Sequence, residues 1–542
     1  MPTMSNTVPS PNLPGGSITL GMVKRQLTST HNRRTKIVCT LGPACWSEEG
    51  LAALLDRGMN VARLNFSHGD HEAHGKTLAR LRKVADAKSR NVAVMLDTKG
   101  PEIRTGFFEG KDVNKIQLEK GKEIVLTSDY TFLGDCTRLA CSYPTLADSV
   151  RPGQEILVAD GSLVLTVLSC DISLGEVVCR IENNAVMGER KNMNLPGVDV
   201  DLPTLTEKDV DDIVNFGIKQ RVEFIAASFV RTEQDVRNLR ALLDDNHGEE
   251  IKIISKIENL QGLRNFSGIL SVTDAVMVAR GDLGMEIPPS KVFLAQKMMI
   301  REANIAGRPV ITATQMLESM IENPRPTRAE CSDVANAVYD GTDAVMLSGE
   351  TANGPFFREA VDVMARTCCE AELSRNYNEM HHAVTNSIVA AYKTLTHGES
   401  IASSAVKASV EVQAKLILVM SETGKMAGYV AKFRPNISTM CLTPTITRAR
   451  QASGLLLGVH TILVDSLRNP DELLEEVNYE LAQSGMLKVG DKIVFIGGKM
   501  SGFREQLRIM QVTEGKSHGR IVKDSDEFFY DRKLMLSFAE VA

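Results

Sequence analysis

A repeated alternation of short apolar runs and helix-length segments is the feature that most restricts how this chain of 542 residues can fold. Each run is rich in Val, Ile, Leu or Met and ends in polar residues or glycine, as buried strands do. The runs begin at Lys36, Asn60, Val92, Val222, Ile251, Ala275, Pro309 and Ala344. Eight strand–helix units predict a TIM (β/α)8 barrel, because the alternative, a doubly wound sheet, rarely needs eight units with polar residues at every strand end.

The alternation stops at Pro101 and resumes at about Leu202. Between these positions, short runs such as Glu123–Thr127 alternate with Gly and Asp turns, and Asp160-Gly161 is a strong hairpin signal. We therefore predict that the barrel carries an inserted, small β domain.

After about Ser374 strands alternate with helices again, in runs that begin at Lys415, Ile437 and Lys492. This part carries no Gly-x-Gly-x-x-Gly nucleotide motif, and we interpret it as a regulatory α/β domain. The first thirty residues are rich in Pro, Ser, Thr, Asn and Gly, without the apolar core of a signal peptide. The predicted domains are a partly disordered or short-helical tail at 1–30, the barrel at 31–100 and 203–373, the inserted β domain at 101–202 and the C-terminal α/β domain at 374–542.

The amino-acid composition limits which cellular compartment and which classes of partner can be expected. A net charge of -6 and a pI near 6.0 give no reason to expect nucleic acid as a partner. Ten cysteines without a Cys-x-x-Cys pair indicate reduced thiols in a reducing compartment. No apolar run reaches the length of a membrane span. We therefore expect a cytoplasmic protein with no membrane partner.

Charged and hydroxyl side chains follow seven of the eight runs, at the strand ends where barrel active sites lie. The stretch Lys252–Ile287 is the densest, because Lys256 and Glu258 end one strand and Asp282 ends the next. Two carboxylates beside a lysine suit Mg²⁺ and a phosphate group, whereas the alternative is a salt bridge that caps two strands. Charge at so many strand ends favours an active site. The other strand-end residues are Arg63, Asn65, Ser67, His68, Asp97, Thr98, Lys99, Ser228, Arg231, Arg280, Gly281, Thr312, Thr314, Gln315, Ser348 and Glu350, with Glu102 and Arg104 just beyond.

Two groups of side chains allow more than one interpretation. An oxygen-rich group with a single charge suits a monovalent cation, although composition alone favours mutual hydrogen bonds. Its members are Asn65, Ser67, Asp97 and Thr98. The histidines His68, His71 and His74 are spaced for a zinc site, but a solvated start of a helix is the favoured interpretation.

Several of these stretches resemble the pyruvate kinase family. The matching motifs are Asn60 to Gly69, Leu96 to Arg104, Ile254 to Asn259, Ala279 to Gly284, Ala313 to Met320 and Pro326 to Glu330. The resemblance extends over nearly the whole chain from about residue 33. It implies a barrel with an inserted lid, a C-terminal regulatory domain and a homotetramer. It also implies that phosphoenolpyruvate and ADP are converted to pyruvate and ATP, with Mg²⁺ (or Mn²⁺) and K⁺ as cofactors.

The resemblance implies roles for the residues nearest the reaction. Arg63 would hold the phosphate of phosphoenolpyruvate, and Lys256 would neutralise the phosphoryl group in flight. Glu258 and Asp282 would bind the divalent ion. Thr314, with the backbone N–H groups near Gly281 and Asp282, would hold the substrate carboxylate and lie where the enolate is protonated.

The remaining roles concern the nucleotide, the proton and the monovalent ion. Arg104 and Lys191 of the inserted domain would close over the nucleotide phosphates, with Asn65 and His68 on the barrel. Ser348 and Glu350 would belong to a proton relay. Potassium would be held by Asn65, Ser67, Asp97 and Thr98. In the family, an acidic residue at the position of Glu102 accompanies dependence on potassium, so we expect this chain to need it.

Two other functions compete with this interpretation. One is another Mg²⁺-dependent barrel that uses phosphoenolpyruvate or pyruvate enolate, but an aldolase needs no lid with Arg104 and Lys191. The other is a degenerate member kept only for binding, but Lys256, Glu258 and Asp282 are all present.

A turn in the C-terminal part suits one phosphate group, although the pattern alone favours an ordinary strand–helix turn. Its members are Ser421, Thr423, Gly424 and Lys425. The resemblance implies that this turn binds a sugar-phosphate effector. Glu422 would repel a phosphate, and the distal loop with Lys499 and Arg504 is short. We therefore expect weak or absent activation by fructose 1,6-bisphosphate, and a sugar monophosphate or no effector fits better.

Overall fold

The computed structural model describes residues 18, 20–25, 27, 29, 30, 32–110, 114–483, 485–498 and 505–513. Helix α1 (Leu20–Lys24) is the element that precedes the barrel. Most of the predicted tail, and the distal loop with Lys499 and Arg504, lie outside the described residues. Among the helices that are described, none is long and apolar enough to cross a membrane.

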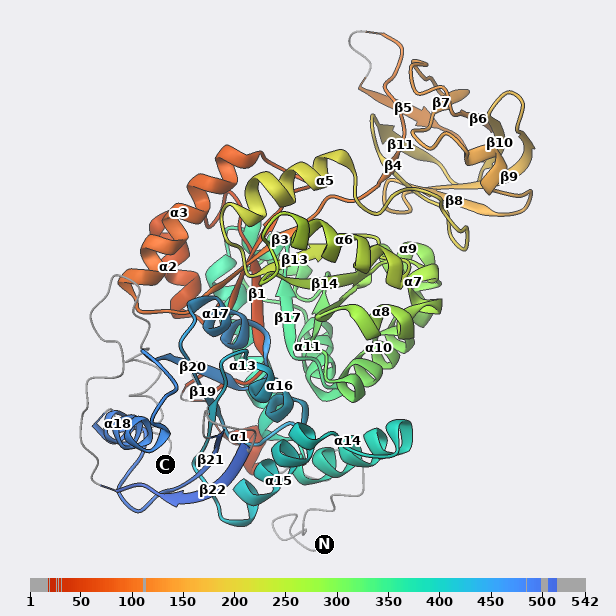
Figure 1. Cartoon of the computed structure of the whole chain (residues 1–542). Helices are drawn as coiled ribbons and strands as arrows, with labels where there is room; N and C mark the ends of the chain where they lie inside the picture. Colours follow the sequence, from red (N-terminus) through yellow and green to blue (C-terminus); the bar gives the residue numbers. More distant parts are fainter. Residues whose placement is uncertain are drawn as a thin grey trace, which may run out of the picture.

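Eight parallel strands close into a barrel, which confirms the predicted fold class and makes the doubly wound alternative wrong (Figure 1). Neighbouring strands follow the chain order, and the last strand pairs with the first. The strands are β1 (Lys36–Thr40), β2 (Val61–Asn65), β3 (Ala93–Asp97), β13 (Phe224–Ala227), β14 (Lys252–Ile257), β15 (Ala275–Ala279), β16 (Val310–Ala313) and β17 (Ala344–Leu347).

Alternate side chains of each barrel strand serve two different cores. Along β1, Val38 packs inside the barrel, whereas Ile37 and Cys39 pack against the surrounding helices. Both faces of the strand are therefore buried, and its sequence is continuously apolar rather than alternating. This double burial is the physical reason that the barrel strands are recognisable as short apolar runs.

Several barrel helices begin at side-chain caps that are set by residues within one helical turn. The Ser47 hydroxyl accepts from the N–H of Gly50 at 3.0 Å, and Thr206 and Asp209 form a reciprocal capping box. The helix after Thr206 continues as a π-helix, η2, which was not predicted. The helices and helical turns are α2 (Glu48–Asp56), α3 (His71–Ala87), α5 (Glu207–Asp211), η2 (Asp212–Ile218), α6 (Glu233–Asp245), α7 (Leu260–Arg264), α8 (Phe266–Val272), α9 (Arg280–Glu286), η3 (Pro289–Lys291), α10 (Val292–Ala306), η4 (Glu318–Ile321), α11 (Arg328–Asp340), α12 (Gly349–Ala352) and α13 (Phe357–Leu373).

The inserted segment, residues 101–202, projects from the barrel as a separate set of strands (Figure 1). It forms a seven-stranded sheet, a two-stranded sheet and its own apolar core. Asp160 and Gly161 have φ angles of 54° and 79°, so the predicted hairpin turn is confirmed. The elements are β4 (Ile103–Arg104), β5 (Lys115–Leu118), β6 (Glu123–Thr127), β7 (Arg138–Ala140), α4 (Leu146–Ser149), β8 (Glu155–Val158), β9 (Leu163–Asp171), β10 (Glu176–Ile181), β11 (Ala185–Gly188) and β12 (Asn192–Asn194).

The C-terminal elements form a five-stranded sheet with helices, as expected for an α/β unit. Two strands were not predicted: β20 lies at one edge, and β22 pairs antiparallel with β21 at the other. The elements are α14 (Tyr377–Tyr392), α15 (His397–Glu411), β18 (Leu416–Met420), α16 (Lys425–Lys432), β19 (Thr439–Thr443), α17 (Ile446–Leu455), β20 (Val459–Leu463), α18 (Pro470–Gln483), β21 (Lys492–Gly498) and β22 (Glu505–Gln511).

The C-terminal elements close the amino end of the barrel. Leu455 of α17 belongs to the same apolar cluster as the residues inside the barrel. A Cβ atom on the neighbouring Gly454 would lie 2.8 Å from the Cβ of Ala93, so only glycine permits this approach. Arg434 also reaches the barrel, where its Nη1 lies 2.6 Å from Oδ1 of Asp343, and both side chains are buried.

Loss of the buried Arg434–Asp343 ion pair should lower the free energy of unfolding by a large amount. Arg434→Met should lower the free energy of unfolding by about 3–5 kcal/mol, because the carboxylate of Asp343 is left buried without its cation. Arg57→Met is the matched control, since Arg57 and Asp362 pair on the surface, with side chains 32% and 42% exposed. The control should cost about 0–1 kcal/mol. Denaturant unfolding of both variants measures the difference, and equal losses would contradict the role of the buried pair.

Candidate active site

A chain of alternating charges lies at the carboxyl ends of the barrel strands. Nε of Arg63 lies 2.6 Å from one carboxylate oxygen of Asp97, and Nζ of Lys256 lies 3.0 Å from the other. Nζ of Lys256 also lies 2.9 Å from the carboxylate of Glu258. All four residues are buried, although they come from three different strand ends. The structure therefore brings together the charged residues that the sequence analysis selected.

Uncharged groups hold these four charged side chains in place. The Lys256 ammonium donates to the hydroxyl of Ser228 at 2.7 Å, and Arg63 donates to the hydroxyl of Thr40 at 2.9 Å. The backbone N–H of Phe229 donates to Glu258 at 2.6 Å. Ser228 was selected only as a strand-end residue without a role, and neither Thr40 nor the N–H of Phe229 was selected. These contacts depend on which strands are neighbours, and the only local signal was a hydroxyl side chain at a strand end.

The pKa values of the charged groups reflect burial and pairing. Burial opposes ionisation of Asp97, but the neighbouring Arg63 and Lys256 outweigh it, so the pKa of Asp97 lies below its usual value. Burial also opposes the charged form of Lys256, but Asp97 and Glu258 outweigh it and raise the pKa of the ammonium. The pairing therefore keeps Asp97 an anion and Lys256 a cation near neutral pH.

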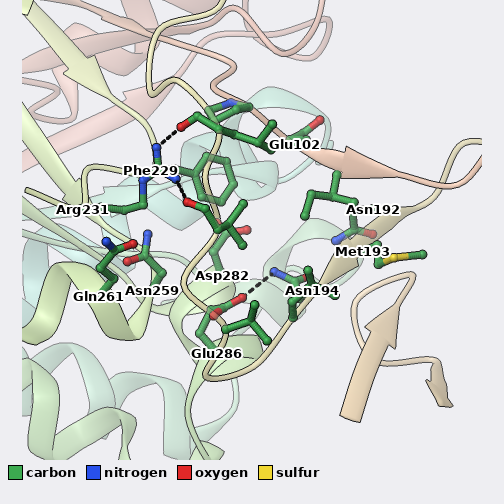
Figure 2. Close-up of a pocket in the computed structure, with 16 residues that line it drawn as sticks. Glu102, Asn192, Met193, Asn194, Phe229, Arg231, Asn259, Gln261, Asp282 and Glu286 are labelled. Carbon is green, nitrogen blue, oxygen red and sulfur yellow. Dashed lines mark hydrogen bonds between the residues drawn. The ribbon is translucent and has the colours of Figure 1, made fainter. Parts of the chain in front are cut away.

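Two acids near these charged side chains form no ion pair within the part of the protein that the structure describes. Burial, and then the charge of Glu258, raise the pKa of Asp282 to about 7. Burial raises the pKa of Glu286 to about 7, although Asn194 of the inserted segment donates to it at 3.4 Å. Both acids line a cavity between the barrel and the inserted segment, which Figure 2 shows with Asn194 facing Glu286. Glu286 was not selected from the sequence, because its burial depends on the distant strand β12.

The backbone after β16 adopts an uncommon conformation. Thr314 and Gln315 have φ angles of 65° and 55°, which cost energy in residues other than glycine. The predicted strand was longer, but it ends at Ala313 because of this turn. The turn points the Thr314 hydroxyl at Gly281, whose N–H donates to it at 3.0 Å. Arg280 fixes the turn from the other side by donating to the Thr314 carbonyl at 2.7 Å.

Ser348 and Glu350 form a buried group at the end of β17. Glu350 accepts from the N–H of Ser348 at 2.6 Å and from the N–H of Leu317 at 3.1 Å. Burial raises the pKa of Glu350 above its usual value. The Ser348 hydroxyl is buried and makes no hydrogen bond within the described residues. It is therefore available to a substrate or to water.

The oxygen-rich group is assembled at the ends of β2 and β3. Asn65 pairs with Asp97 in the strand register, and its side-chain oxygen accepts from the N–H of Ser67 at 3.1 Å. The carbonyl of Thr98 accepts from the hydroxyl of Ser228 at 2.6 Å. Only the contact between Asn65 and Ser67 is a mutual hydrogen bond of the kind that composition favoured, because Ser228 is not a member of the group. The oxygens keep further lone pairs, so the group also fits a monovalent cation.

The three histidines do not converge. Helix α3 begins at His71, within the stretch interpreted as the start of a helix, but His71 and His74 are partly buried rather than fully solvated. The ring of His74 stacks on Phe66 with centroids 4.3 Å apart, and its Nε2 lies 2.8 Å from the carbonyl of His68. Nε2 of His71 lies instead 2.8 Å from the carboxylate of Asp212.

Residues of the inserted segment lie at its edge near the barrel. Arg104 of β4 donates to Glu102 at 2.8 Å and to the carbonyl of Arg190 at 2.9 Å. The N–H of Lys191 donates to the hydroxyl of Thr105 at 2.9 Å. Lys191 directly precedes β12, which pairs with the strand β4 that carries Arg104.

The turn at the carboxyl end of β18 carries the candidate effector residues. The Ser421 hydroxyl accepts from the N–H of Met426, and the Thr423 hydroxyl accepts from the N–H of Lys425, both at 3.4 Å. Gly424, with a φ angle of 76°, precedes helix α16. The turn therefore has the N–H groups and hydroxyls of a phosphate site at a helix start.

Comparisons with known proteins agree over nearly the whole chain. Residues 32–361 match the family model described as "Pyruvate kinase, barrel domain", and residues 399–513 match "Pyruvate kinase, alpha/beta domain". A pyruvate kinase of Eimeria tenella is 49% identical over 483 residues, which cover 88% of this chain and 89% of that protein. A "Pyruvate kinase, cytosolic isozyme" of Glycine max is 48% identical and covers 85% of this chain and 93% of that protein.

Solved structures give the same result. A crystal structure of a pyruvate kinase from Cryptosporidium parvum is 45% identical, has a TM-score of 0.87 and covers 92% of this chain and 100% of that chain. A structure titled as the Cryptosporidium parvum enzyme in complex with ADP is 46% identical, has a TM-score of 0.80 and covers 91% of this chain and 99% of that chain.

The raised pKa of Glu286 predicts that the stability of the protein depends on pH. The pKa of about 7 in the folded state exceeds the usual value of 4.5, so the buried ionised form costs free energy. This cost is absent below pH 4.5, grows as the pH rises, and is complete above pH 7. Glu286→Gln should therefore raise the apparent Tm at pH 8 and change it little at pH 4.5, whereas the exposed control Glu411→Gln should show no such trend. Calorimetry at the two pH values measures this, and an equal shift at both would contradict the burial argument.

Proposed function

The chain belongs to the pyruvate kinase family, and on this premise we propose how its residues divide the work of the reaction. It is a phosphotransferase that moves the phosphoryl group of phosphoenolpyruvate to ADP and yields pyruvate and ATP, the last step of glycolysis. The aldolase-type and binding-only alternatives are therefore wrong. The observation that carries the proposal is Lys256, a buried cation between two carboxylates with Arg63 beside them.

Arg63 and Lys256 would bind the phosphate of phosphoenolpyruvate. Arg63 uses Nε and Nη1 for Asp97 and Thr40, and its Nη2 remains for a phosphate oxygen among the contacts of the described residues. The Lys256 ammonium stays charged at all working pH values because of its raised pKa. Phosphoryl transfer needs positioning and charge neutralisation rather than a covalent intermediate, and a fixed cation supplies both.

Glu258 and Asp282 would hold Mg²⁺ or Mn²⁺. The two carboxylates fit a hard divalent ion, because burial and the charge of Glu258 raise the pKa of Asp282 although Lys256 opposes the shift, and a bound cation would stabilise the ionised form. A bound divalent ion would neutralise developing charge on the substrate oxygens. Lys256 restrains one oxygen of Glu258 and the N–H of Phe229 restrains the other, so the ligand is oriented before any ion arrives.

Thr314 and its neighbours would bind and protonate the rest of the substrate. The Thr314 hydroxyl accepts from the N–H of Gly281, so its own proton is free to be donated. This hydroxyl and the N–H groups near Gly281 and Asp282 would hold the substrate carboxylate. Ser348 and Glu350 would belong to the relay that delivers the proton to the enolate. Two observations support this role: within the described residues the buried hydroxyl of Ser348 makes no hydrogen bond, and the pKa of the neighbouring Glu350 is raised.

The inserted segment would act as a lid over the nucleotide. Arg104 and Lys191 would close on the phosphates of ADP or ATP, and Asn65 and His68 would meet the nucleotide from the barrel. Support comes from Arg104 on the edge strand β4, from Lys191 directly before the neighbouring strand β12, and from the solved relative in complex with ADP. Closure would exclude water, which otherwise hydrolyses the phosphoryl donor.

Asn65, Ser67, Asp97 and Thr98 would hold K⁺. Their oxygens surround the end of β2 and β3, and a bound monovalent cation would place positive charge near the substrate phosphate. Glu102 supports this assignment, because its carboxylate is paired with Arg104 and brings no positive charge to the site. A bound monovalent cation would therefore have to supply that charge.

The effector site, the oligomeric state and the cellular location are three further proposals. Ser421, Thr423, Gly424 and Lys425 would bind the phosphate of a sugar-phosphate effector, which the backbone N–H groups at the start of α16 support. We also propose a homotetramer, from family membership, and a cytoplasmic location, from relatives named as cytosolic isozymes.

Replacement of the central lysine tests the proposed site. Lys256→Met keeps the side-chain length and removes the charge, so kcat should fall on the order of 10³-fold, equivalent to about 4 kcal/mol of transition-state stabilisation. The control Lys252→Met lies at the opposite end of the same strand and should leave kcat nearly unchanged. A coupled assay for pyruvate measures both. High kcat with a large rise in KM for phosphoenolpyruvate would show that Lys256 only binds substrate.

Exchange of the monovalent cation tests the potassium site. Replacement of K⁺ by tetramethylammonium at constant ionic strength should reduce activity about tenfold or more, because the large ion cannot fit among the strand-end oxygens. Restoring K⁺ should restore activity. Full activity without K⁺ or Na⁺ would refute the assignment.

Titration of sugar phosphates tests the effector proposal. Fructose 1,6-bisphosphate should activate weakly or not at all at sub-saturating phosphoenolpyruvate, because Glu422 lies beside the phosphate turn. Glucose 6-phosphate is the matched monophosphate. A strong response to the bisphosphate at low concentration would overturn the argument.

A further inference from the structure

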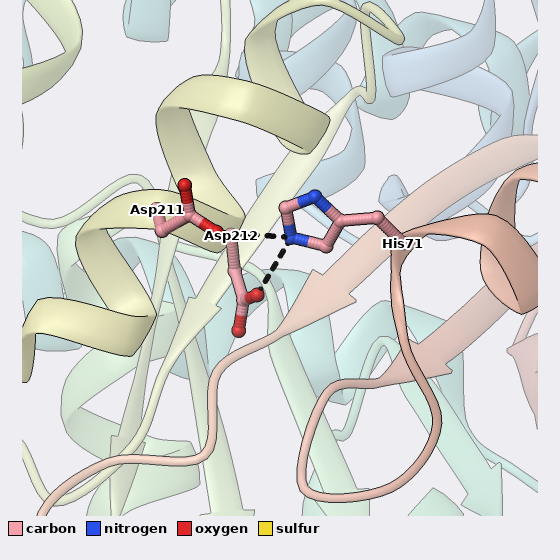
Figure 3. Close-up of side chains that lie close together, drawn as sticks. All are labelled: His71, Asp211 and Asp212. Carbon is pink, nitrogen blue, oxygen red and sulfur yellow. Dashed lines mark hydrogen bonds and ion pairs between the residues drawn. The ribbon is translucent and has the colours of Figure 1, made fainter.

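A second group of metal-ligating side chains lies outside the proposed catalytic site. It consists of His71 at the start of α3, Asp211 at the end of α5 and Asp212 at the start of η2 (Figure 3). Nε2 of His71 lies 2.8 Å from Oδ1 of Asp212 and 3.7 Å from Oδ2 of Asp211. One ligand atom from each residue lies within 4.8 Å of the other two.

These spacings match those around a small divalent ion. With bonds of about 2.0–2.2 Å, neighbouring ligand atoms of a tetrahedral or octahedral ion lie about 2.9–3.5 Å apart. The distance from Nε2 of His71 to Asp212 lies just below that range, and the distance to Asp211 lies just above it. The carboxylates of Asp211 and Asp212 lie within 4.8 Å of each other, so a shift of the exposed Asp211 side chain would complete the geometry. An imidazole with two carboxylates is a ligand set for borderline ions such as Zn²⁺ rather than for Mg²⁺, which takes oxygen ligands.

The cluster is accessible and carries the charge that such an ion needs. The side chains of His71 and Asp211 are 35% and 59% exposed, so an ion can enter from solvent. Asp212 is 3% exposed and supplies a fixed anchor. The change from α-helix to π-helix at Asp212 presents consecutive carboxylates to one histidine, and such π segments are frequent at functional sites.

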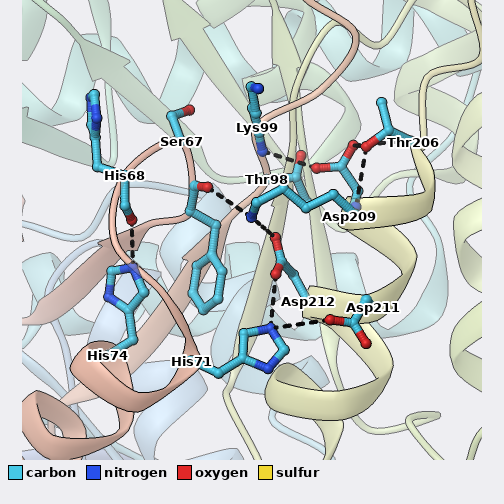
Figure 4. A network of polar contacts seen from close by, with 12 residues as sticks. Ser67, His68, His71, His74, Thr98, Lys99, Thr206, Asp209, Asp211 and Asp212 are labelled. Atoms are coloured by element: carbon cyan, nitrogen blue, oxygen red, sulfur yellow. Dashed lines mark hydrogen bonds and ion pairs between the residues drawn. The ribbon is translucent and has the colours of Figure 1, made fainter.

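The cluster is connected to the loop that carries two proposed potassium ligands. Nζ of Lys208 lies 2.5 Å from Oδ2 of Asp212 and donates to the backbone carbonyl of Phe66 at 3.1 Å. Phe66 stands between Asn65 and Ser67 in the sequence. Figure 4 shows His71, Asp211 and Asp212 on one side of this network, with Ser67 and Thr98 on the other.

We propose that His71, Asp211 and Asp212 bind a divalent ion of the zinc class, and that the bound ion changes the response of the enzyme to monovalent cation through Lys208. The ion replaces the proton on Nε2 of His71, which leaves to solvent. Its charge repels the Lys208 ammonium and competes for Asp212, so the anchor from Lys208 to the Phe66 carbonyl weakens. The binding half of the proposal stands alone, whereas the coupling half rests on the proposed potassium site.

Equilibrium dialysis against Zn²⁺ at saturating Mg²⁺ tests the binding half. The wild-type chain should retain one more Zn²⁺ than His71→Gln, whose amide can still donate to Asp212 but is a poor metal ligand. Asp211→Asn, at an exposed position, should also bind more weakly. The control His382→Gln replaces an exposed histidine of α14 and should match the wild type. Equal uptake by wild type and His71→Gln would overturn the site.

The K⁺ activation curve with and without Zn²⁺ tests the coupling half. Zn²⁺ should raise the half-activating K⁺ concentration several-fold in the wild type and leave it unchanged in His71→Gln. Zn²⁺ uptake without a shift of the curve would overturn the coupling. An enzyme that ignores K⁺ altogether would contradict the coupling and the proposed potassium site, while the dialysis still decides the metal site.

Discussion

Burial of the Asp97 carboxylate at the mouth of the barrel is the constraint on which the rest of the site depends. A buried carboxylate is costly unless cations and donors surround it, and here Arg63 and Lys256 each take one of its oxygens. Two cations around one anion leave one positive charge in excess, and Glu258 offsets it, so the four groups together are neutral. A phosphate group could still contact Arg63 and Lys256 directly, and a divalent ion held by Glu258 would supply the further positive charge. The removal of any member would strand another charge, so the cluster acts as one unit.

The fold places this cluster by closing one end of the barrel and leaving the other open. Leu455 and the Arg434–Asp343 pair seal the amino end, so the packing between domains is separated from the chemistry. At the carboxyl end, neighbouring strands bring side chains distant in sequence within hydrogen-bond distance. The left-handed turn at Thr314 costs about 1–3 kcal/mol, and it aims a hydroxyl that a relaxed strand would direct elsewhere.

The barrel and the charged residues of the site were predictable because their signals are local. Each strand is a short apolar run that ends in polar residues, and the caps at Ser47 and Thr206 are set by residues within one helical turn. The groups that hold the charges were not predictable, since Ser228 and the N–H of Phe229 become partners of Lys256 and Glu258 only through strand neighbourhood.

Long-range packing explains the other differences between sequence and structure. The raised pKa of Glu286 needs the inserted segment to cover it, and nothing near Glu286 in the sequence reports that burial. The His71 ring stands at the start of α3 but contacts Asp212, which is far along the chain, and the ring is therefore only partly solvated. Strands β20 and β22 lie at the edges of their sheet, where packing imposes a weaker apolar pattern on the sequence than it does on the barrel strands.

The central claim is that the buried charge chain is a phosphate and metal site rather than a structural pin. A crystal structure with phosphoenolpyruvate and Mg²⁺ tests this claim most directly. The account predicts that phosphate oxygens contact Nζ of Lys256 and the guanidinium of Arg63, and that one divalent ion is shared by Glu258 and Asp282. A phosphate bound elsewhere, with the contacts of Lys256 to Asp97 and Glu258 unchanged and no ion between the two acids, would contradict it.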